Sequence, residues 1–226
     1  MSAFLVSQQC LDLGLRAGAI VLRDLRIASA SDELRRQIEC QVERIQQQYT
    51  SAADVRSVPE LIKHFEILRQ VGVKPRSHPP STYKLLELAR KRGTLSDVNN
   101  LVDAYNLVSV QTMCSLGAHD LDRIAVPIQL KLFTGQETFR PLGSTEHRAI
   151  QRGEFGYVDA EDRVICRLDS LQAEFSKVTE DTTSALLIIE ATVDHDAQQL
   201  MKVFADTVEA VRRHCGGTAE IVSMPS

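Results

Sequence analysis

The sequence contains no apolar run of the length that a membrane-spanning helix requires, about 20 residues. Its first stretch, MSAFLVSQQCLDL, lacks both the basic segment and the small-residue cleavage site of a secretory signal. Cysteine is scarce, and Cys10, Cys40, Cys114, Cys166 and Cys215 do not show the spacing of a zinc site. An odd number of thiols without a pairing pattern is typical of a reducing compartment. We therefore expect a cytoplasmic protein with free cysteines and no membrane partner.

Several catalytic and nucleotide-binding motifs are also missing. The chain has neither GxxxxGK[ST] nor GxGxxG, so phosphate-binding loops of these two types are excluded. It has no GxSxG, the turn that carries the nucleophile in α/β-hydrolases, and no HExxH or paired CxxC that would supply a zinc site. We therefore expect neither a cofactor nor a bound metal.

The formal net charge of −4 disfavours a protein that coats nucleic acid, because such binding depends on an excess of Lys and Arg. The charge is unevenly distributed, however, since residues 60–92 carry eight basic residues and only three glutamates. This stretch is either a solvated helix face or a local patch that contacts phosphates. The candidate phosphate-contacting residues are Lys74, Arg76, Lys84, Arg90, Lys91 and Arg92.

Helical patterns dominate the first half of the chain and short strand-like runs dominate the second, before a last amphipathic helix. That order predicts an α+β fold with mixed and antiparallel sheets packed against helices. No repeat or clear linker divides the chain. We predict a single domain over 1–226, with an N-terminal strand and helix part (1–73), a motif-bearing core (74–191) and a C-terminal helix and strand (195–223).

Local signals predict where individual helices begin and end. Ser57 and Glu60 have the spacing of a capping box, so a helix is expected to start there. The next helix is expected to stop at Gly93, which suits the position after a helix end. Another helix is expected to begin near Ser96 or Asp97.

The stretch VDAYNLVSVQTMCSLGAHD, residues 102–120, predicts a largely buried helix that closes on a polar turn. Asn99, Asp103 and Asn106 follow i, i+4, i+7 spacing and form one polar stripe. The helix continues as an almost wholly apolar stretch. These polar groups must then be satisfied internally or face a cavity, because an unpaired buried polar group costs about 1–3 kcal/mol. The residues themselves leave a structural and a ligand-facing role equally open.

The segment LVDAYNLVSVQTMCSLGAHDLDRI resembles the pattern VDxxNxVxxxxxxPxxAxDLDxI in the editing domain of the phenylalanyl-tRNA synthetase beta subunit and in free-standing relatives of that domain. Downstream, GQETFRPLG, GEFGYVDAEDRVICR and AEFSKVTEDTTSALLIIEA resemble successive parts of the same domain in order. The resemblance is strongest over 74–191. It implies the fold of that domain and hydrolysis of the ester of mischarged tRNA, typically tyrosine on the phenylalanine tRNA, and it does not imply ligase activity.

The resemblance also implies roles for individual residues. The family's pocket asparagine falls on Asn106 and its pocket glutamate on Glu174, while its pocket histidine falls on Gly117. His119 is the available substitute, and an ordinary pKa near 6.5 would suit a general base. The predicted catalytic residues are therefore His119 and Glu174. The predicted substrate-binding residues are Asn106, Asp103, Gly117, Ala118 and Asp120. The expected partners are the tRNA acceptor end, bound transiently, and the amino acid that it carries. With tRNA as the partner, the six candidate phosphate-contacting residues become the predicted tRNA-binding residues.

Other functions stay open on the residues alone. A domain that keeps the pocket but binds an amino acid or tRNA without hydrolysis is favoured by Gly117 and by the acidic net charge. A metal-dependent hydrolase would use His119, Asp120 and Asp122. Cys114 could be a nucleophile, although a cysteine in an apolar helix is more often a packing group.

Overall fold

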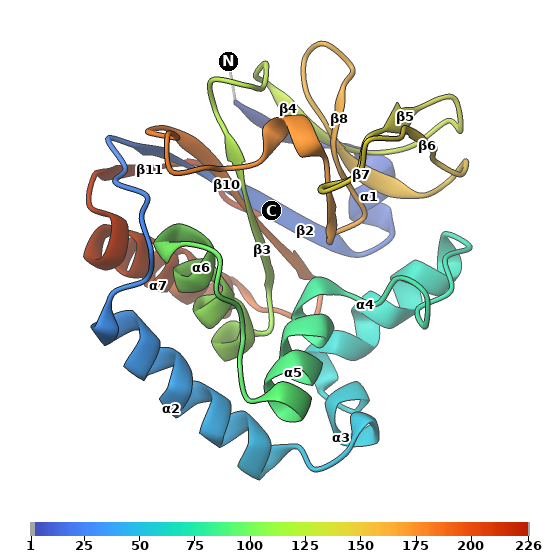
Figure 1. The fold of residues 1–226 in the computed structure, drawn as a ribbon. Coiled ribbons are helices and arrows are strands. Elements are labelled where there is room, and N and C mark those ends of the chain that lie inside the picture. Colours follow the sequence, from blue (N-terminus) through green and yellow to red (C-terminus); the bar gives the residue numbers. More distant parts are fainter. Residues whose placement is uncertain (1–2, 226) are drawn as a thin grey trace.

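Two β-sheets pack against each other in the computed structural model, which describes residues 3–225 (Figure 1). The helices are α1 (Gln8–Asp12), α2 (Asp32–Gln48), α3 (Ala52–Arg56), α4 (Pro59–Gln70), α5 (Ser81–Arg92), α6 (Asn100–Thr112), α7 (Ala197–Cys215) and the short 3₁₀ helix η1 (Glu174–Ser176). The strands are β1 (Phe4–Val6), β2 (Leu15–Arg23), β3 (Ser115–Asp120), β4 (Ile128–Leu132), β5 (Thr138–Phe139), β6 (Arg148–Ala149), β7 (Phe155–Val158), β8 (Val164–Arg167), β9 (Leu171–Gln172), β10 (Ala185–Thr192) and β11 (Thr218–Ser223).

The larger sheet has the strand order β1-β4-β7-β8-β9, and only its β1–β4 pair is parallel. The second sheet has the order β11-β2-β10-β3 and is antiparallel throughout. Strands β5 and β6 form a small hairpin-like pair beside them. The predicted α+β fold with mixed and antiparallel sheets is therefore confirmed.

Three of the hydrophobic clusters lie between the sheets and helices. The first lies between the two sheets, with residues of β1, β4, β7 and β8 on one side and of β2 and β10 on the other. The second lies between the outer face of the four-stranded sheet and helices α6 and α7. The third joins helices α2 to α6 below the sheets (Figure 1). The two edge strands β3 and β9 adjoin where the sheets meet α5, and this junction positions the candidate site.

Residue chemistry explains several of the helix ends. The Ser31 hydroxyl accepts a hydrogen bond from the backbone N–H of Leu34 at 3.2 Å and caps α2. Gly93 follows α5 with a φ of 67°, a left-handed conformation that glycine adopts without strain. Asp196 and Gln199 form a capping box at the start of α7.

The structure corrects three local predictions. The long buried helix ends at Thr112, the left-handed residue Met113 (φ 60°) turns the chain, and the expected polar turn is part of strand β3. That helix also begins later than predicted, because its cap is Asn99. Helix α4 is preceded by Val58 without a side-chain cap, whereas Ser57 ends the unpredicted helix α3.

Within residues 3–225, no helix combines the length and the apolar character needed to cross a membrane.

Candidate functional site

Strand β3 lies at the edge of its sheet and turns alternate side chains to opposite faces. Leu116 and Ala118 pack against helices α6 and α7. The β10 residues opposite Gly117 and His119 belong to the cluster between the sheets. Gly117 and His119 therefore face the five-stranded sheet, and so does Ser115. We call the surface formed by Ser115, Gly117 and His119 the β3 face.

Gly117 borders open space on this face. A Cβ atom built on Gly117 would meet no atom within 4 Å, although the residue lies in the middle of a strand. In contrast, a Cβ on Gly156 of β7 would lie 2.4 Å from the carbonyl oxygen of Cys166. Packing thus requires a glycine at position 156 but not at position 117. The space beside Gly117 is where the family resemblance predicts a pocket side chain.

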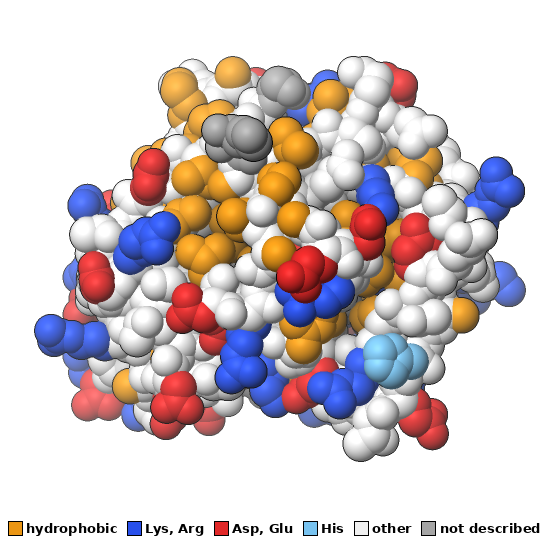
Figure 2. Space-filling view, turned by 90° about the horizontal axis from the view of Figure 1, so that it is seen from above, with side chains coloured by type: hydrophobic (Ala, Val, Ile, Leu, Met, Phe, Trp, Pro, Cys, Tyr) orange, Lys and Arg blue, Asp and Glu red, His pale blue; other side chains and the backbone are white. Residues whose placement is uncertain are grey.

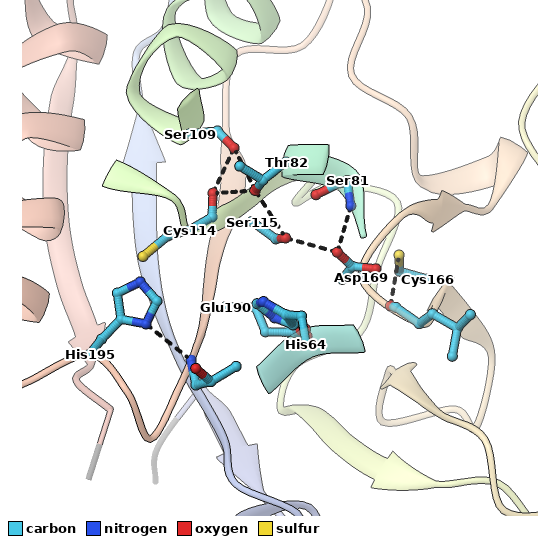
Figure 3. A network of polar contacts seen from close by, with 12 residues as sticks. His64, Ser81, Thr82, Ser109, Cys114, Ser115, Cys166, Asp169, Glu190 and His195 are labelled. Atoms are coloured by element: carbon cyan, nitrogen blue, oxygen red, sulfur yellow. Dashed lines mark hydrogen bonds and ion pairs between the residues drawn. The ribbon is translucent and has the colours of Figure 1, made fainter. Parts of the chain in front are cut away.

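A polar network fixes the lower end of the β3 face (Figure 3). Ser115 Oγ donates to Asp169 Oδ2 at 2.8 Å, and the backbone N–H of Ser81 donates to the same oxygen at 2.8 Å. Thr82 Oγ1 lies 3.4 Å from Ser115 Oγ and donates to the carbonyl of Cys114 at 3.0 Å. Asp169 is thereby held beside the strand, and its Oδ1 has no hydrogen-bond partner among residues 3–225.

Lys84 lies next to this carboxylate. Its Nζ donates to Ser170 Oγ at 2.8 Å. Burial lowers the pKa of Lys84, and the charge of Asp169 acts in the opposite direction. The pKa of His78 is lowered by burial and by the charges of Arg167 and Lys84. Lys84 therefore belongs to the surroundings of the β3 face and not to an exposed patch on α5.

A buried ion pair lies beside Ser115 on the same sheet face (Figure 3). Glu190 of β10 accepts a hydrogen bond from the Tyr157 hydroxyl, and its Oε1 lies 3.4 Å from His64 Nε2. Burial lowers the pKa of His64, but the hydrogen bond and the charge of Glu190 outweigh burial and raise it. Burial raises the pKa of the Glu190 carboxyl. The pair fastens α4 to the sheet.

His119 forms the upper end of the β3 face and is 3% exposed. Its Nδ1 lies 2.9 Å from Ser176 Oγ, and Gln172 Nε2 lies 3.5 Å from the same nitrogen. Gln172 also donates to the Ala118 carbonyl at 3.0 Å, which joins the edge strands β9 and β3. Burial lowers the pKa of His119 to about 4. The imidazole is neutral at pH 7, and the expected ordinary pKa is wrong.

Asp120 points away from His119, as the alternation of β3 requires. Its carboxylate accepts hydrogen bonds from Thr182 Oγ1 at 2.7 Å and from the backbone N–H of Asp122 at 3.0 Å. The described part of the chain contains no group of three or more His, Cys, Asp or Glu residues placed to hold a metal. The His119, Asp120 and Asp122 cluster of the metal-dependent alternative is therefore not assembled.

Asp103 and Asn106 hold the segment before α6. Asp103 accepts hydrogen bonds from Ser96 Oγ at 2.6 Å and from the Val98 backbone N–H at 3.3 Å. Asn106 Nδ2 donates to Ser96 Oγ at 3.1 Å. Burial raises the pKa of Asp103. No hydrogen bond joins either side chain to Gly117 or His119, and the substrate-binding role of both stays a prediction.

Glu174 lies in η1, between Gln172 and Ser176 in the sequence, and both of these residues contact His119. Gln172 and Ser176 turn toward His119, whereas the Glu174 carboxylate accepts from the Gly143 backbone N–H at 2.8 Å and pairs with Lys177. The Lys177 bond and the Gly143 N–H lower its pKa, so the carboxylate is charged at neutral pH. Its role in catalysis stays a prediction, since its contacts tie it to the segment around Gly143.

The six predicted tRNA-binding residues do not form one patch. Arg90 and Lys91 are paired with Glu87, and Lys84 lies at the β3 face. Lys74 and Arg76 line a separate cleft of about 900 Å³, which we call the basic cleft; α3, α4, α5 and residues 72–79 surround it. On the face of the molecule seen in Figure 2, Lys and Arg are interspersed with Asp and Glu around a hydrophobic area.

The B3/4 domain matches residues 66–214. The chain belongs to the B3/4 domain family. It is also similar to a solved N-terminal fragment of the phenylalanyl-tRNA synthetase beta subunit from Pyrococcus horikoshii, with a TM-score of 0.53 and 16% identity. That match covers 96% of this chain and 50% of the fragment, so the chain spans about half of the fragment's length. No curated protein matches the chain. The predicted relation to the synthetase domain is confirmed.

The residues at the site of this B3/4 domain that escaped prediction include Ser115, Asp169 and Gln172. Ser115 had a usable signal, because residues 115, 117 and 119 share one face as soon as the segment is assigned to a strand. Asp169 lies in the turn between β8 and β9 and Gln172 lies in β9, and the sequence gives no sign that they meet β3. Cys114 is a packing group in this B3/4 domain, since burial raises the pKa of its thiol to about 12.

Proposed function

We propose that this B3/4 domain is a tRNA-binding, trans-acting aminoacyl-tRNA deacylase that hydrolyses the ester bond of mischarged tRNA at the β3 face. The observation that carries the proposal is the open space at Gly117, between Ser115 and His119 on one strand face. Membership of the B3/4 family and the likeness to a synthetase fragment support tRNA as the ligand. The resemblance of the motifs supports the ester bond as the target.

The site offers a complementary group for each part of an aminoacyl ester. Among the described residues, the contacts of Asp169 with Ser115 and Ser81 engage its Oδ2, so its Oδ1 can bind the α-ammonium group. The amino-acid side chain takes the space beside Gly117. Nε2 of His119 has no hydrogen-bond partner among the described residues, so it can accept a hydrogen bond from a water molecule.

Hydrolysis then follows a simple sequence. The water attacks the ester carbonyl carbon, the bond from that carbon to the ribose oxygen breaks, and the ribose hydroxyl leaves with a proton. A base with a pKa of about 4 removes little of the water's proton, so His119 acts mainly by holding the water in line. The neighbouring ribose hydroxyl assists, and the protein supplies positioning and electrostatic stabilisation.

Replacing His119 by alanine is expected to slow deacylation about 10²-fold for every mischarged tRNA, because the positioned water is lost.

Replacing Glu174 by alanine is expected to slow deacylation only of tRNAs whose amino acid carries a hydroxyl group. A site that hydrogen-bonds a hydroxyl discriminates strongly against amino acids that lack it. The measurement is a time course of deacylation with several mischarged tRNAs. Unchanged rates in both variants would remove both residues from the mechanism.

The pH profile of the reaction gives a further expected result. A neutral imidazole is the working form of His119, and its pKa is about 4. The neutral form is therefore complete above pH 5 and is lost only as the pH falls through 4. We expect no His119 inflection near pH 6.5, after subtraction of the spontaneous hydrolysis rate. A wild-type inflection near 6.5 that disappears in His119→Ala would show that the histidine titrates normally and would contradict this assignment.

One observation favours a binding module without hydrolysis as the second candidate. A buried imidazole with a pKa of about 4 is a weak base, and efficient general bases have pKa values near the working pH. Binding without turnover would appear as protection of an aminoacyl-tRNA from spontaneous hydrolysis. Hydrolysis of the aminoacyl-tRNA ester faster than the spontaneous rate would support the deacylase instead.

A further inference from the structure

The basic cleft concentrates cations in a molecule with a net charge of −4. Four cations line it: Arg56, Arg69, Lys74 and Arg76. All four are exposed, and none of them forms a salt bridge within the described residues. No acidic residue lines the cleft. An unpaired cluster of this kind attracts a ligand with several negative charges, and Arg and Lys bind phosphates through charge-assisted hydrogen bonds.

The cleft also has an apolar and planar side. The guanidinium carbon of Arg56 lies 5.9 Å from the centre of the Tyr83 ring, so the cation stacks over an aromatic face. Phe65 supports Tyr83 in an edge-to-face contact with ring centres 5.4 Å apart. Ile62 is 44% exposed at the same cleft. A stacked guanidinium beside exposed aliphatic surface is a platform on which a nucleobase can lie.

We infer that the basic cleft binds the single-stranded 3′ end of the RNA, with its phosphates on Arg69, Lys74 and Arg76 and a base on Arg56. A volume of about 900 Å³ exceeds what a lone phosphate needs and lies at the upper end of clefts that hold organic ligands. The inference rests on the proposed function, which supplies tRNA as the RNA. It adds Arg56 of α3 and Arg69 of α4 to the six candidate tRNA-binding residues.

The cleft and the β3 face share one wall. Tyr83 lines the cleft, while the preceding residue, Thr82, contacts Ser115 at the β3 face. Ser77 and Pro79 line the cleft, whereas His78 between them lies under the influence of Lys84 and Arg167. An RNA end held in the cleft therefore lies beside α5, the helix whose first residues fix Asp169 and Ser115. The RNA would pass the N-terminal end of α5 to bring its terminal ester to the β3 face.

The test measures binding of a fluorescent six-nucleotide single-stranded RNA that ends in CCA, which contains no ester. Arg69→Glu and Lys74→Glu are each expected to weaken binding about tenfold at low salt. Each should also flatten the slope of log affinity against log salt by about 0.7, the share of one phosphate contact in single-stranded RNA. Arg44→Glu is the matched control, since Arg44 is exposed on α2, outside the cleft, and carries the same charge change.

Arg56→Lys separates stacking from charge. The variant keeps the cation but loses the planar guanidinium, so its affinity for the RNA with normal bases should fall severalfold. Its affinity for an RNA of the same length without bases should not change. The slope of log affinity against log salt should stay as in the wild type. Equal affinity of the hexanucleotide for wild type, Arg69→Glu and Lys74→Glu would overturn the inference. AMP binding as tightly as the hexanucleotide would also overturn it, in favour of a mononucleotide site.

The inference and the proposed function fail separately. RNA bound at the cleft by a protein that deacylates nothing would sustain the inference and refute the deacylase. Deacylation with unchanged KM for tRNA in Arg69→Glu and Lys74→Glu would sustain the deacylase and refute the cleft as the place of the RNA end.

Discussion

Replacing Gly117 by phenylalanine is expected to reduce deacylation about 10²-fold or more while the protein stays folded. The side chain would fill the open space on the β3 face, where the amino acid is proposed to lie. Displacement of a reacting group by about 1 Å already costs about 10²-fold in rate. Phenylalanine suits a β-strand, and no atom within 4 Å of the new Cβ opposes it. Deacylation time courses and urea unfolding of the same variant measure both effects.

Two alanine variants serve as controls for this result. Gly117→Ala adds one methyl group to open space and should keep both stability and most of the activity. Gly156→Ala should lower the free energy of unfolding by about 1–3 kcal/mol, because its Cβ would lie 2.4 Å from the Cys166 carbonyl oxygen and 2.6 Å from the Phe133 ring. A Gly117→Phe variant that deacylates at the wild-type rate contradicts the assigned site, and one that unfolds contradicts the open space.

Replacing His64 by leucine is expected to lower the free energy of unfolding by about 3–5 kcal/mol at pH 7. Removal of one partner of a buried pair leaves the other charge uncompensated. Glu190 is 2% exposed and would keep only the Tyr157 hydroxyl. Urea unfolding at pH 7 measures the loss.

The double variant His64→Leu with Glu190→Gln is the control for the second prediction. Glutamine removes the buried charge and keeps an oxygen for the Tyr157 hydroxyl, so much of the lost stability should return. In the wild type, the raised pKa of His64 means that the contribution of the pair is complete below pH 6.5 and is lost as the pH rises through the raised value. A His64→Leu protein within 1 kcal/mol of the wild type at pH 7 contradicts the ion pair.

Much of the fold could be predicted from the sequence, because its signals are local. The cap at Ser31, the helix end at Gly93 and the change from helices to strands depend on neighbouring residues only. Strand β3 could not be predicted, since both of its faces are largely buried and its composition continues that of α6. The chain turns at Met113, a residue that rarely adopts a left-handed conformation, and no glycine marks the turn.

Motif order placed Gly117 and His119 in the candidate site. The structure puts both residues on one strand face, which is what a replacement of a side chain at position 117 by His119 would require. The low pKa of His119 follows from burial by residues of β9 and η1, far away in the sequence. Asp169 meets Ser115 only because the edges of two sheets adjoin, a contact that local patterns do not contain.

The most direct test of the account is a deacylation screen of the wild-type protein with a panel of mischarged tRNAs, each compared with its spontaneous hydrolysis. We expect at least one ester, on a tRNA with an amino acid that does not belong to it, to be hydrolysed with multiple turnovers. We also expect Gly117→Phe to remove this activity. Hydrolysis at the spontaneous rate for every tRNA in the panel would contradict the deacylase.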